Sequence, residues 1–469
     1  MKIYDPEMDQ GEAIKGKTFL SSNLWLPKER VSDIDILLRA CTFYQENRKT
    51  GQSKSIKLAT VKKYHVVVPR YLLSVNSPSE GALGSIEEPE YKWKRIDFKS
   101  KVKPRNPAQE KAWGAFSNQN FGTLNLACGK GKTVLALHKI AQRKVPAVVV
   151  VSSVGLMNQW KERALQFLGL KEEEIGTVQG KKAEWDKPLV IAMVQTLVSQ
   201  KLSIPMDVRR RFGTIIFDEV HHMAATSFVQ TADLFFGARF GLTATPKRED
   251  GLEDVYFAHI GPIFYSDLKG ELSADIFFKK LPTSLTRKEE EEMLDKIGEF
   301  SVGKFYQVLA NKASRNKYIL DVVEQALGSG RKLLVLVHAA KHPKILLDNF
   351  NTAERKTSYT AAAVSGITKG ADRTRLMEEA DVTFATFGVA KEGLDVASLD
   401  TLIFATPFKA WGAFQQGKGR VERITTNKKD PLVVVLDDYG VGPAAAMCNT
   451  LRRLIKIKGF SYKNVNRNQ

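Results

Sequence analysis

Residues 122–140, GTLNLACGKGKTVLALHKI, join a short apolar run, a glycine-containing turn and a helix-compatible segment with no spacer between them. A short apolar run bounded by turn residues is typical of a buried strand. Glycines after a strand let backbone amides approach a ligand that a Cβ would keep away, and the following helix directs the positive end of its dipole at the same point. The stretch therefore predicts a phosphate-binding turn between a strand and a helix.

Each residue of the turn has an expected role. Gly129, Lys130 and Gly131 would surround the phosphates, Lys132 would reach the β- and γ-phosphates, and the hydroxyl of Thr133 would bind Mg²⁺. The full phosphate-loop pattern has a further glycine five positions before Gly131, which is a leucine in this chain. Taken alone, the stretch leaves open a Gly/Lys turn that binds no ligand.

Residues 214–223, TIIFDEVHHM, supply the acidic partner that such a turn requires. An apolar run ends at Asp218, and Glu219 follows directly. We expect Asp218 to contact Mg²⁺ through its water shell and Glu219 to activate the attacking water. The alternative is a pair of acids that only cap a strand. His221 would then couple the γ-phosphate to the rest of the protein.

Similar apolar runs recur along the chain and set the expected architecture. GTLNLA, VPAVVVV, LVIAMV, TIIFDE and FGLTAT come first, and KLLVLVH, AAAVSG, VTFAT, TLIFAT and PLVVVLDD follow farther along. Helix-compatible stretches separate most of them, which favours parallel sheets covered by helices on both faces. We therefore expect an α/β fold with two tandem lobes, residues 96–265 and 331–445, joined by a helical segment, residues 266–330.

The ends of the chain are basic. The run SIKLATVKKYHVVVPRYLL predicts strands, so residues 1–95 should form a small mixed α+β domain, followed along the chain by a basic tail at residues 446–469. No acidic residue occurs from Asn47 to Ser79. This region is either a solvated basic face or a nucleic-acid surface, and the domain is a candidate for DNA binding.

Composition narrows the choice of partner. The 469 residues carry a formal charge of +19, which favours a polyanion such as nucleic acid or an anionic membrane. No apolar run of about 18 residues occurs, and the first residues have no signal-peptide core, so the membrane is the weaker option. The three cysteines are far apart, which favours a reducing cytoplasmic compartment, in the host cell if the chain is viral.

The order of motifs resembles superfamily 2 helicases of the DEAD/DEAH type, spelled DEVH here. The resemblance runs from about Lys103 to Asp437, and it implies two RecA-like lobes that hydrolyse ATP with Mg²⁺. In the first lobe it assigns roles that the spacing alone does not give. Gln109 would read adenine; Gln159, Trp160 and Thr196 would contact a nucleic-acid backbone; Thr243 and Thr245 would couple hydrolysis to lobe movement.

The second lobe carries matching motifs in ATFGVAKEGLDVASL and QQGKGRVERI. The resemblance implies that Thr386 contacts nucleic acid and that Gly393, Asp395 and Gln416 lie at the nucleotide. Arg420 and Arg423 would stabilise charge on the γ-phosphate in the transition state, a role that suits a planar bidentate cation.

Within the superfamily the likeness is strongest to XPB-like repair helicases and to phage helicases of the UvsW kind. ACGKGKT, the QW pair and the triplet Arg248, Glu249 and Asp250 carry it. It implies an ATP-dependent motor on forked, branched or duplex DNA in recombination, repair or replication. An RNA-directed helicase or transcript-release ATPase is the alternative, and a binding module with a vestigial ATPase is a third reading that the intact catalytic set opposes.

Overall fold

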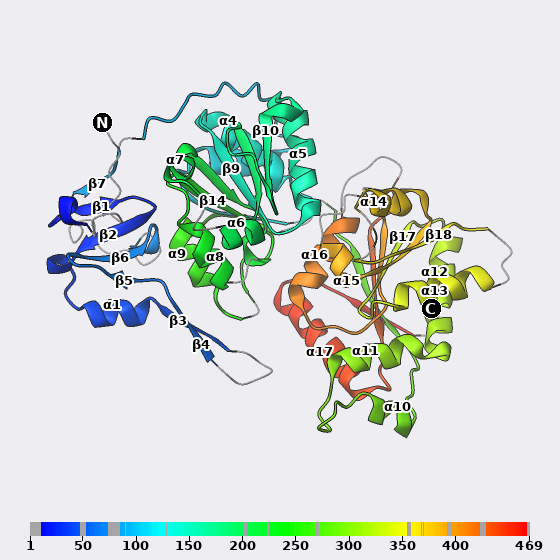
Figure 1. Cartoon of the computed structure of the whole chain (residues 1–469). Helices are drawn as coiled ribbons and strands as arrows, with labels where there is room; N and C mark the ends of the chain where they lie inside the picture. Colours follow the sequence, from blue (N-terminus) through cyan, green and yellow to red (C-terminus); the bar gives the residue numbers. More distant parts are fainter. Residues whose placement is uncertain are drawn as a thin grey trace. The chain divides into compact units, whose positions relative to one another are not determined.

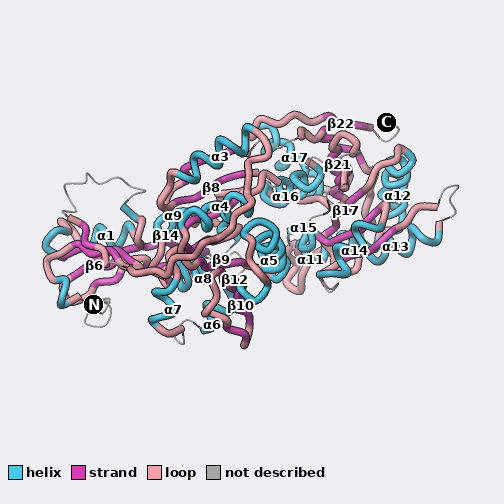
Figure 2. Tube along the Cα trace, turned by 90° about the horizontal axis from the view of Figure 1, so that it is seen from above, coloured by secondary structure: helices cyan, strands magenta, loops and turns pink. Residues whose placement is uncertain are grey.

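The computed structural model divides into two compact units, Met1–Leu268 and Lys269–Gln469, which Figure 1 colours along the chain. It describes residues 11–46, 53–73, 85–89, 91–127, 129–200, 204–222, 225–248, 250–268, 272–353, 358–366, 368, 370–391, 396, 398–422 and 428–466. In each unit the strands lie between helices, as Figure 2 shows in magenta and cyan. The predicted α/β fold with two parallel-sheet lobes is confirmed.

The sheet of the first lobe has the strand order β11-β10-β12-β9-β13-β14-β8-β15, and its pairs are parallel except β10 with β11. All five runs predicted in this lobe form strands. Three further strands, β10, β11 and β15, are not continuous apolar runs, because they mix polar and apolar residues. The strands are β8 (Gly122–Leu126), β9 (Ala147–Val151), β10 (Ile175–Gln179), β11 (Lys182–Ala183), β12 (Leu189–Met193), β13 (Thr214–Phe217), β14 (Ala238–Thr243) and β15 (Ile263–Asp267).

Helices cover both faces of this sheet. One apolar cluster joins one face to α3 (Pro107–Ser117), α4 (Lys132–Arg143) and α5 (Val154–Leu168). A second cluster joins the opposite face to α6 (Val194–Gln200), α8 (Ala225–Ala232) and α9 (Glu253–Ile260), and α7 (Met206–Arg211) packs against it through Val208. Strands that are buried on both faces need apolar residues at successive positions, which is why these strands are continuous apolar runs.

The N-terminal part of the first unit is a small mixed domain. Its five-stranded sheet has the order β5-β6-β2-β1-β7, and β3 and β4 form a separate two-stranded sheet. The domain contains helix α1 (Ile34–Ala40). The strands are β1 (Thr18–Leu20), β2 (Asn23–Pro27), β3 (Thr42–Glu46), β4 (Ser53–Lys57), β5 (Thr60–Val61), β6 (His65–Pro69) and β7 (Ile86–Glu87).

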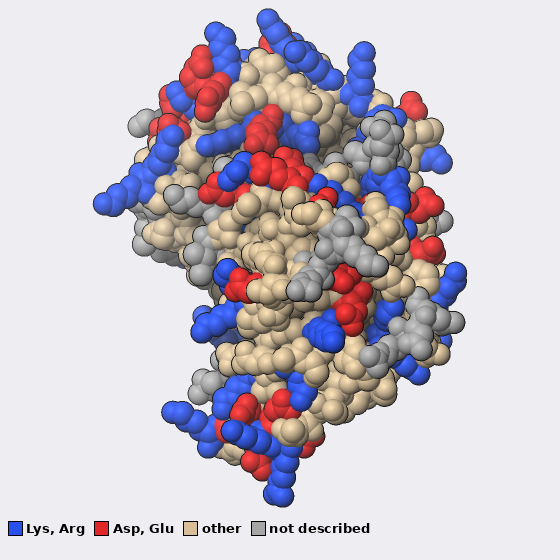
Figure 3. All heavy atoms as spheres, turned by 90° about the vertical axis from the view of Figure 1, so that its right-hand side faces the viewer, with Lys and Arg blue, Asp and Glu red and all other residues tan. Residues whose placement is uncertain are grey.

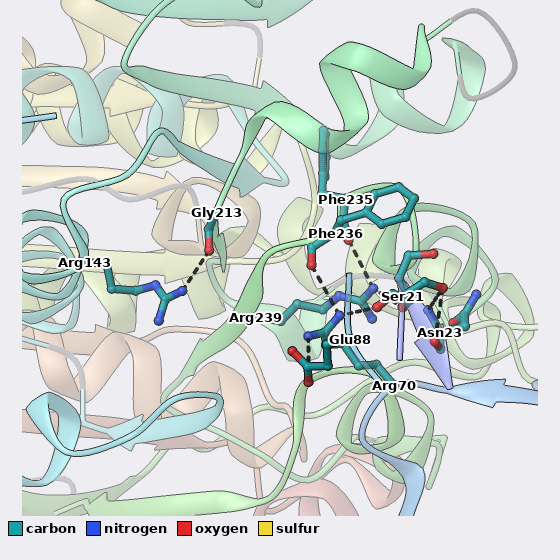
Figure 4. A network of polar contacts seen from close by, with 10 residues as sticks. Ser21, Asn23, Arg70, Glu88, Arg143, Gly213, Phe235, Phe236 and Arg239 are labelled. Carbon is teal, nitrogen blue, oxygen red and sulfur yellow. Dashed lines mark hydrogen bonds and ion pairs between the residues drawn. The ribbon is translucent and has the colours of Figure 1, made fainter. Parts of the chain in front are cut away.

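Two arginines hold this domain against the first lobe, as Figure 4 shows. The guanidinium of Arg239 is fully buried and donates to the carbonyls of Ser22 and Phe235, and to that of His259 at 3.1 Å. Arg70 donates to the carbonyl of Ser21 and, at 3.3 Å, to that of Phe236. Each guanidinium therefore bonds carbonyls of both parts, which makes the domain continuous with the lobe.

The second unit contains a seven-stranded parallel sheet with the order β18-β19-β17-β20-β21-β16-β22. Its strands are β16 (Asp275–Lys280), β17 (Leu333–Val337), β18 (Ala361–Val364), β19 (Val382–Thr386), β20 (Thr401–Phe404), β21 (Leu432–Asp437) and β22 (Lys463–Val465). Its helices are α10 (Arg287–Glu292), α11 (Val302–Asn311), α12 (Ala313–Gly328), α13 (His342–Thr352), α14 (Gly370–Glu379), α15 (Phe387–Lys391), α16 (Trp411–Val421) and α17 (Gly442–Ile457).

Two segments of this unit differ from the expected boundaries. Residues 266–330, expected to connect the lobes, include β16, which pairs with β21 inside the second sheet. The basic tail likewise contributes most of α17 and the edge strand β22. DIFFKK and the tail were not recognised as strands because their lysines mask the apolar positions, although Phe278 is fully buried.

The surface mixes both signs of charge on the face that Figure 3 shows, with basic side chains projecting at its upper and lower edges. The excess of basic residues is therefore not gathered into one patch on that face. No helix in the described part of the chain is long and apolar enough to cross a membrane.

Candidate functional site

The turn after β8 has the backbone that a phosphate cradle needs. Gly129 and Gly131 adopt φ of 84° and 79°, a region that favours glycine. A Cβ on Gly131 would lie 2.3 Å from Nε2 of Gln109, the end of a flexible side chain that can shift, so the backbone conformation is what favours glycine there. Helix α4 starts at Lys132, so its first amides point into the turn.

Gln109 joins helix α3 to this turn. The side chain of Asn106 caps α3 by accepting from the backbone N–H of Gln109, and Pro107 occupies the first helical position. The buried carboxamide of Gln109 donates to the carbonyl of Lys130 at 3.3 Å and accepts from the N–H of Arg105 at 2.9 Å. These contacts leave one amide hydrogen that a base could accept, so the adenine role stays a prediction.

The two lysines of the turn have different partners. Nζ of Lys132 is buried, donates to the carbonyl of Leu126 at 3.2 Å and lies 3.5 Å from Oε1 of Glu219. Lys130 forms an ion pair with Asp267 at the end of β15. Asp267 has no sequence signal of its own, because β15 mixes polar and apolar residues and does not stand out as an apolar run. The arrangement places the ammonium of Lys132 between the glycine turn and the acidic pair.

Asp218 follows β13 and lies inside the core. Its Oδ2 accepts from Nε1 of Trp160 at 2.7 Å, and its Oδ1 accepts from the N–H of Glu219 at 2.9 Å. Burial and the neighbouring Glu219 carboxylate raise the pKa of Asp218, and the Trp160 hydrogen bond and Lys132 lower it in part. A buried carboxylate of this kind is stabilised in its charged form by a nearby cation.

Glu219 and His221 join the acidic pair to β14. Glu219 has φ of 46°, a strained conformation for a residue with a side chain, which the surrounding contacts hold in place. Its Oε2 lies 3.5 Å from Nδ1 of His221, and Nδ1 also lies 2.7 Å from Oγ1 of Thr243. Oγ1 of Thr243 accepts from the N–H of Thr245 at 3.1 Å. The predicted residues therefore form one contact chain from Lys132 to Thr245.

Two oxygen-bearing side chains near the glycine turn, those of Asp218 and Thr133, suit a magnesium ion. A carboxylate on Asp218 and a hydroxyl on half-buried Thr133 are hard oxygen ligands, which Mg²⁺ prefers, and several of its ligands are usually water and phosphate. Among the residues described, no group of three or more His, Cys, Asp or Glu could hold a metal by itself. The residues thus fit an ion that arrives with a nucleotide.

Two of the expected nucleic-acid contacts lie below the surface. Trp160 is fully buried on α5 with its indole N–H bonded to Asp218, so the expectation that it contacts nucleic acid is wrong for this structure. Thr196 is also buried, and its Oγ1 accepts from the N–H of Gly180 at 2.9 Å. Gln159 is half-buried one position before Trp160 and keeps its predicted role as a proposal.

The second unit holds the remaining predicted residues. Thr386 ends β19 and is half-buried. Gln416 is buried and Arg420 is half-buried, both on α16, four positions apart and therefore on one helix face. The backbone N–H of Ala274 donates to Oε1 of Glu422 at 3.0 Å, which ties the end of α16 to the start of β16. Gly393, Asp395 and Arg423 lie outside the described residues.

Arg248, to which motif spacing alone assigns no role, contacts the backbone of His221. Arg248 donates from Nη1 to the carbonyl of His221 at 2.9 Å and binds Asp250 from Nε and Nη2 at 2.8 and 2.7 Å. The triplet of Arg248, Glu249 and Asp250 carries a family likeness in the sequence, but the likeness does not predict this contact with His221. Glu249 lies outside the described residues. The charged pair fixes the backbone of the loop that carries His221.

Comparison with known proteins agrees with this geometry. A family model described as "Type III restriction enzyme, res subunit" matches residues 93–248, which include the phosphate turn and the acidic pair. "DNA 3'-5' translocase XPB2" of Sulfurisphaera tokodaii is 33% identical over 199 residues, which cover 41% of this chain and 43% of that protein. The chain thus spans less than half the length of this relative.

Two longer matches are more distant. "Putative ATP-dependent RNA helicase L396" of Acanthamoeba polyphaga mimivirus is 23% identical over 380 residues, 80% of this chain and 71% of that protein. The solved structure titled "S. cerevisiae Dbp5 L327V bound to RNA and ADP BeF3" has a TM-score of 0.55 at 12% identity and covers 79% of this chain and 90% of that chain. At this identity the structural likeness extends to the fold alone.

Proposed function

Because the chain is a superfamily 2 helicase, distantly related to the XPB and Rad25 proteins, we propose that it couples ATP hydrolysis to movement along DNA. The observation that carries the proposal is the contact chain from Lys132 through Glu219 and His221 to Thr243. It joins a phosphate turn, an acidic pair and a third strand end within one lobe. A turn that only closes a strand would not require these residues together.

The first lobe would bind the nucleotide. Amides of Gly129 and Gly131 and the first amides of α4 would hold the phosphates, and Lys132 would move from Glu219 to the β- and γ-phosphates. Thr133 and Asp218 would hold Mg²⁺, which neutralises developing phosphate charge when bound. Glu219, released from Lys132, would accept a proton from the attacking water.

The second lobe would complete the site. Arg420 and Arg423 would approach the γ-phosphoryl group when the lobes close. A guanidinium group suits this role because it can donate two parallel hydrogen bonds to phosphate oxygens that gain charge in the transition state. Gly393, Asp395 and Gln416 would contact the nucleotide from the same lobe. Closure with ATP and opening after hydrolysis would alternate the affinity for a nucleic-acid backbone, which Gln159 and Thr386 would contact.

DNA is the favoured track, in forked, branched or duplex form, with a role in recombination, repair or replication. Relatives named as DNA helicases or translocases match this chain at higher identity than the relative named as an RNA helicase. The latter covers more of the chain, which keeps RNA as the alternative. The formal charge of +19 supplies sequence-independent affinity for either phosphate backbone.

ATP hydrolysis by the whole chain, measured with different nucleic acids, tests the proposal. Single-stranded DNA, duplex DNA, a fork, a four-way junction and RNA would be compared at equal nucleotide concentration and at two salt concentrations. We expect DNA to raise the rate, with the fork or junction raising it most, and high salt to reduce the effect. Preferential stimulation by RNA would replace DNA with RNA as the track, and no stimulation by any of them would reject the motor function.

A further inference from the structure

The hairpin β3–β4 has two faces of different character. Its strands pair with each other and with no other strand in the described part of the domain. The register pairs Phe43 with Ile56 and Tyr44 with Ser55, and side chains of paired residues share a face of the hairpin. Phe43 and Ile56 therefore lie on one face, and Tyr44 and Ser55 lie on the other.

The inner face is part of the core. Ile56 is buried, and Phe43 packs against the same apolar cluster, which also contains Phe217 and Val220 of the first lobe. The backbone N–H of Leu58 donates to the carbonyl of Cys41 at 2.9 Å and closes the base of the hairpin. Together with Arg70 and Arg239 of Figure 4, these contacts fix the hairpin to the first lobe.

The outer face is open and has the chemistry of a nucleic-acid platform. Tyr44 is 66% exposed, more than any other aromatic side chain in the part of the chain that the structure describes. Ser53, Ser55 and Lys57 are exposed on this face. The register also pairs Glu46, the last residue of β3, with Ser53, and the sequence that follows, from Asn47 to Ser79, contains no acid. An open ring offers a stacking surface to a base, and adjacent lysine and hydroxyl groups can bind the phosphates on either side.

The inner face also touches the site of ATP hydrolysis through one loop. Nε2 of Gln45 donates to Oδ2 of Asp250 at 3.4 Å, and Asp250 is held by Arg248. Arg248 in turn donates to the carbonyl of His221, whose ring lies 3.5 Å from Glu219. Contacts therefore run without a break from the hairpin to the residue that would activate water.

We propose that the outer face of the β3–β4 hairpin binds one strand of nucleic acid, with a base stacked on Tyr44, and that Gln45 transmits this contact to the ATP site. The proposal deepens the proposed function, on which it rests for the nature of the ligand. A strand held here would be contacted by a surface rigidly joined to the first lobe. Tyr44 is the binding residue, and Gln45 is a positioning residue that acts through Asp250 and Arg248.

Binding of a dye-labelled oligodeoxythymidylate, measured by fluorescence anisotropy without ATP, tests the surface. Tyr44→Ala should weaken binding about 10-fold, because stacking on one base is lost, and Tyr44→Phe should bind within about 2-fold of the wild type. Ile36→Ala, which truncates an exposed side chain on α1 of the same domain, is the control and should bind like the wild type. Thermal melting of each variant verifies the fold, and an oligouridylate arm compares RNA with DNA.

Equal binding by wild-type protein and Tyr44→Ala would reject the surface. Lys57→Gln gives a second reading that does not depend on the ring: it should weaken binding and reduce its salt dependence, because one phosphate contact is removed. A strong loss with Tyr44→Ala but no change in affinity or salt dependence with Lys57→Gln would also contradict the proposed mode of binding.

Gln45→Leu tests the transmission. We expect oligonucleotide affinity to stay within about 2-fold of the wild type while the stimulation of ATP hydrolysis by the bound strand falls at least about 3-fold. A purely structural role would change both or neither, and an unchanged stimulation would reject the link. If no nucleic acid stimulates the wild-type protein, the motor function fails, whereas binding that depends on Tyr44 would still identify the hairpin surface.

Discussion

Trp160 is a buried side chain that supports the ATP site by donating a hydrogen bond to Asp218. Its indole N–H donates to Asp218 at 2.7 Å while the ring fills the core between α5 and the sheet. The QW pair in the sequence suggested a surface contact with nucleic acid. The motif identifies the pair of neighbouring residues but not which of the two side chains faces solvent. In the structure Gln159 is partly exposed and Trp160 is buried.

Trp160→Phe should therefore damage the ATP site rather than the nucleic-acid surface. The smaller phenyl ring leaves part of the indole volume empty, and the buried Asp218 carboxylate loses its donor; the lost hydrogen bond alone should cost about 1–3 kcal/mol of unfolding free energy. We expect slower ATP hydrolysis with unchanged affinity for an oligonucleotide. Urea unfolding, hydrolysis rates and anisotropy measure the three effects, with Trp185→Phe, a half-buried tryptophan of the same lobe, as control. If the variant binds the oligonucleotide more weakly at unchanged stability, Trp160 contacts nucleic acid, as the sequence motif predicts.

At the scale of elements, the strands that are continuous apolar runs could be predicted, and the strands that mix polar and apolar residues could not. Runs such as AVVVV and LLVLV leave no alternative to a central strand, because every position faces an apolar layer. β16 and β22 carry lysines toward solvent, so their pattern resembles a loop or a helix end. The boundary of the second lobe was misplaced for this reason, since β16 joins its sheet from a segment expected to connect the lobes.

The helix pair α12–α13 of the second unit makes a prediction about pH. His342 is fully buried, its Nε2 is 2.9 Å from Oδ1 of Asn316, and burial, with a smaller effect of Arg315, lowers its pKa to about 3. Between about pH 6.5 and that value the unfolded chain binds a proton that the native protein does not, so stability falls as pH falls.

Replacement of this histidine by a group that does not titrate should flatten the response. His342→Gln should make the fall in unfolding free energy between about pH 6 and pH 4 shallower by about 1.4 kcal/mol per pH unit. Urea unfolding at several pH values measures the slope for the wild type and the variant. Parallel slopes would mean that His342 is protonated in the native protein.

At the scale of the whole first unit, the N-terminal domain and the lobe form one body through Arg239, which is buried, and Arg70, which is partly buried. This could not be predicted from the sequence, because Arg70 and Arg239 are separated along the chain and no local pattern marks an arginine as buried. The sequence does show that the domain is basic, which predicts a surface for nucleic acid but not how the domain is attached to the lobe. The structure adds that any ligand on this surface is held by the same body that carries Lys132 and Glu219.

Arg239→Met should loosen that attachment. It leaves the carbonyls of Ser22, Phe235 and His259 without this donor, and buried groups that lose a partner cost about 1–3 kcal/mol each. We expect a loss of at least about 2 kcal/mol in unfolding free energy, or a separate early transition for the domain. Arg39→Met on exposed α1 is the control, and a variant as stable as this control would show that the attachment does not depend on Arg239.

The central claim is that the contact chain around Glu219 is a site of ATP hydrolysis and that nucleic acid stimulates this hydrolysis. The variant Glu219→Gln tests the claim most directly. The substitution keeps the size of a side chain that lies 3.5 Å from Lys132 and removes its ability to accept a proton. Steady-state hydrolysis with saturating DNA should fall at least about 100-fold while nucleotide binding persists, and Glu162→Gln, at an exposed position of α5, should hydrolyse ATP like the wild type. Undiminished turnover by a folded Glu219→Gln variant would contradict the account.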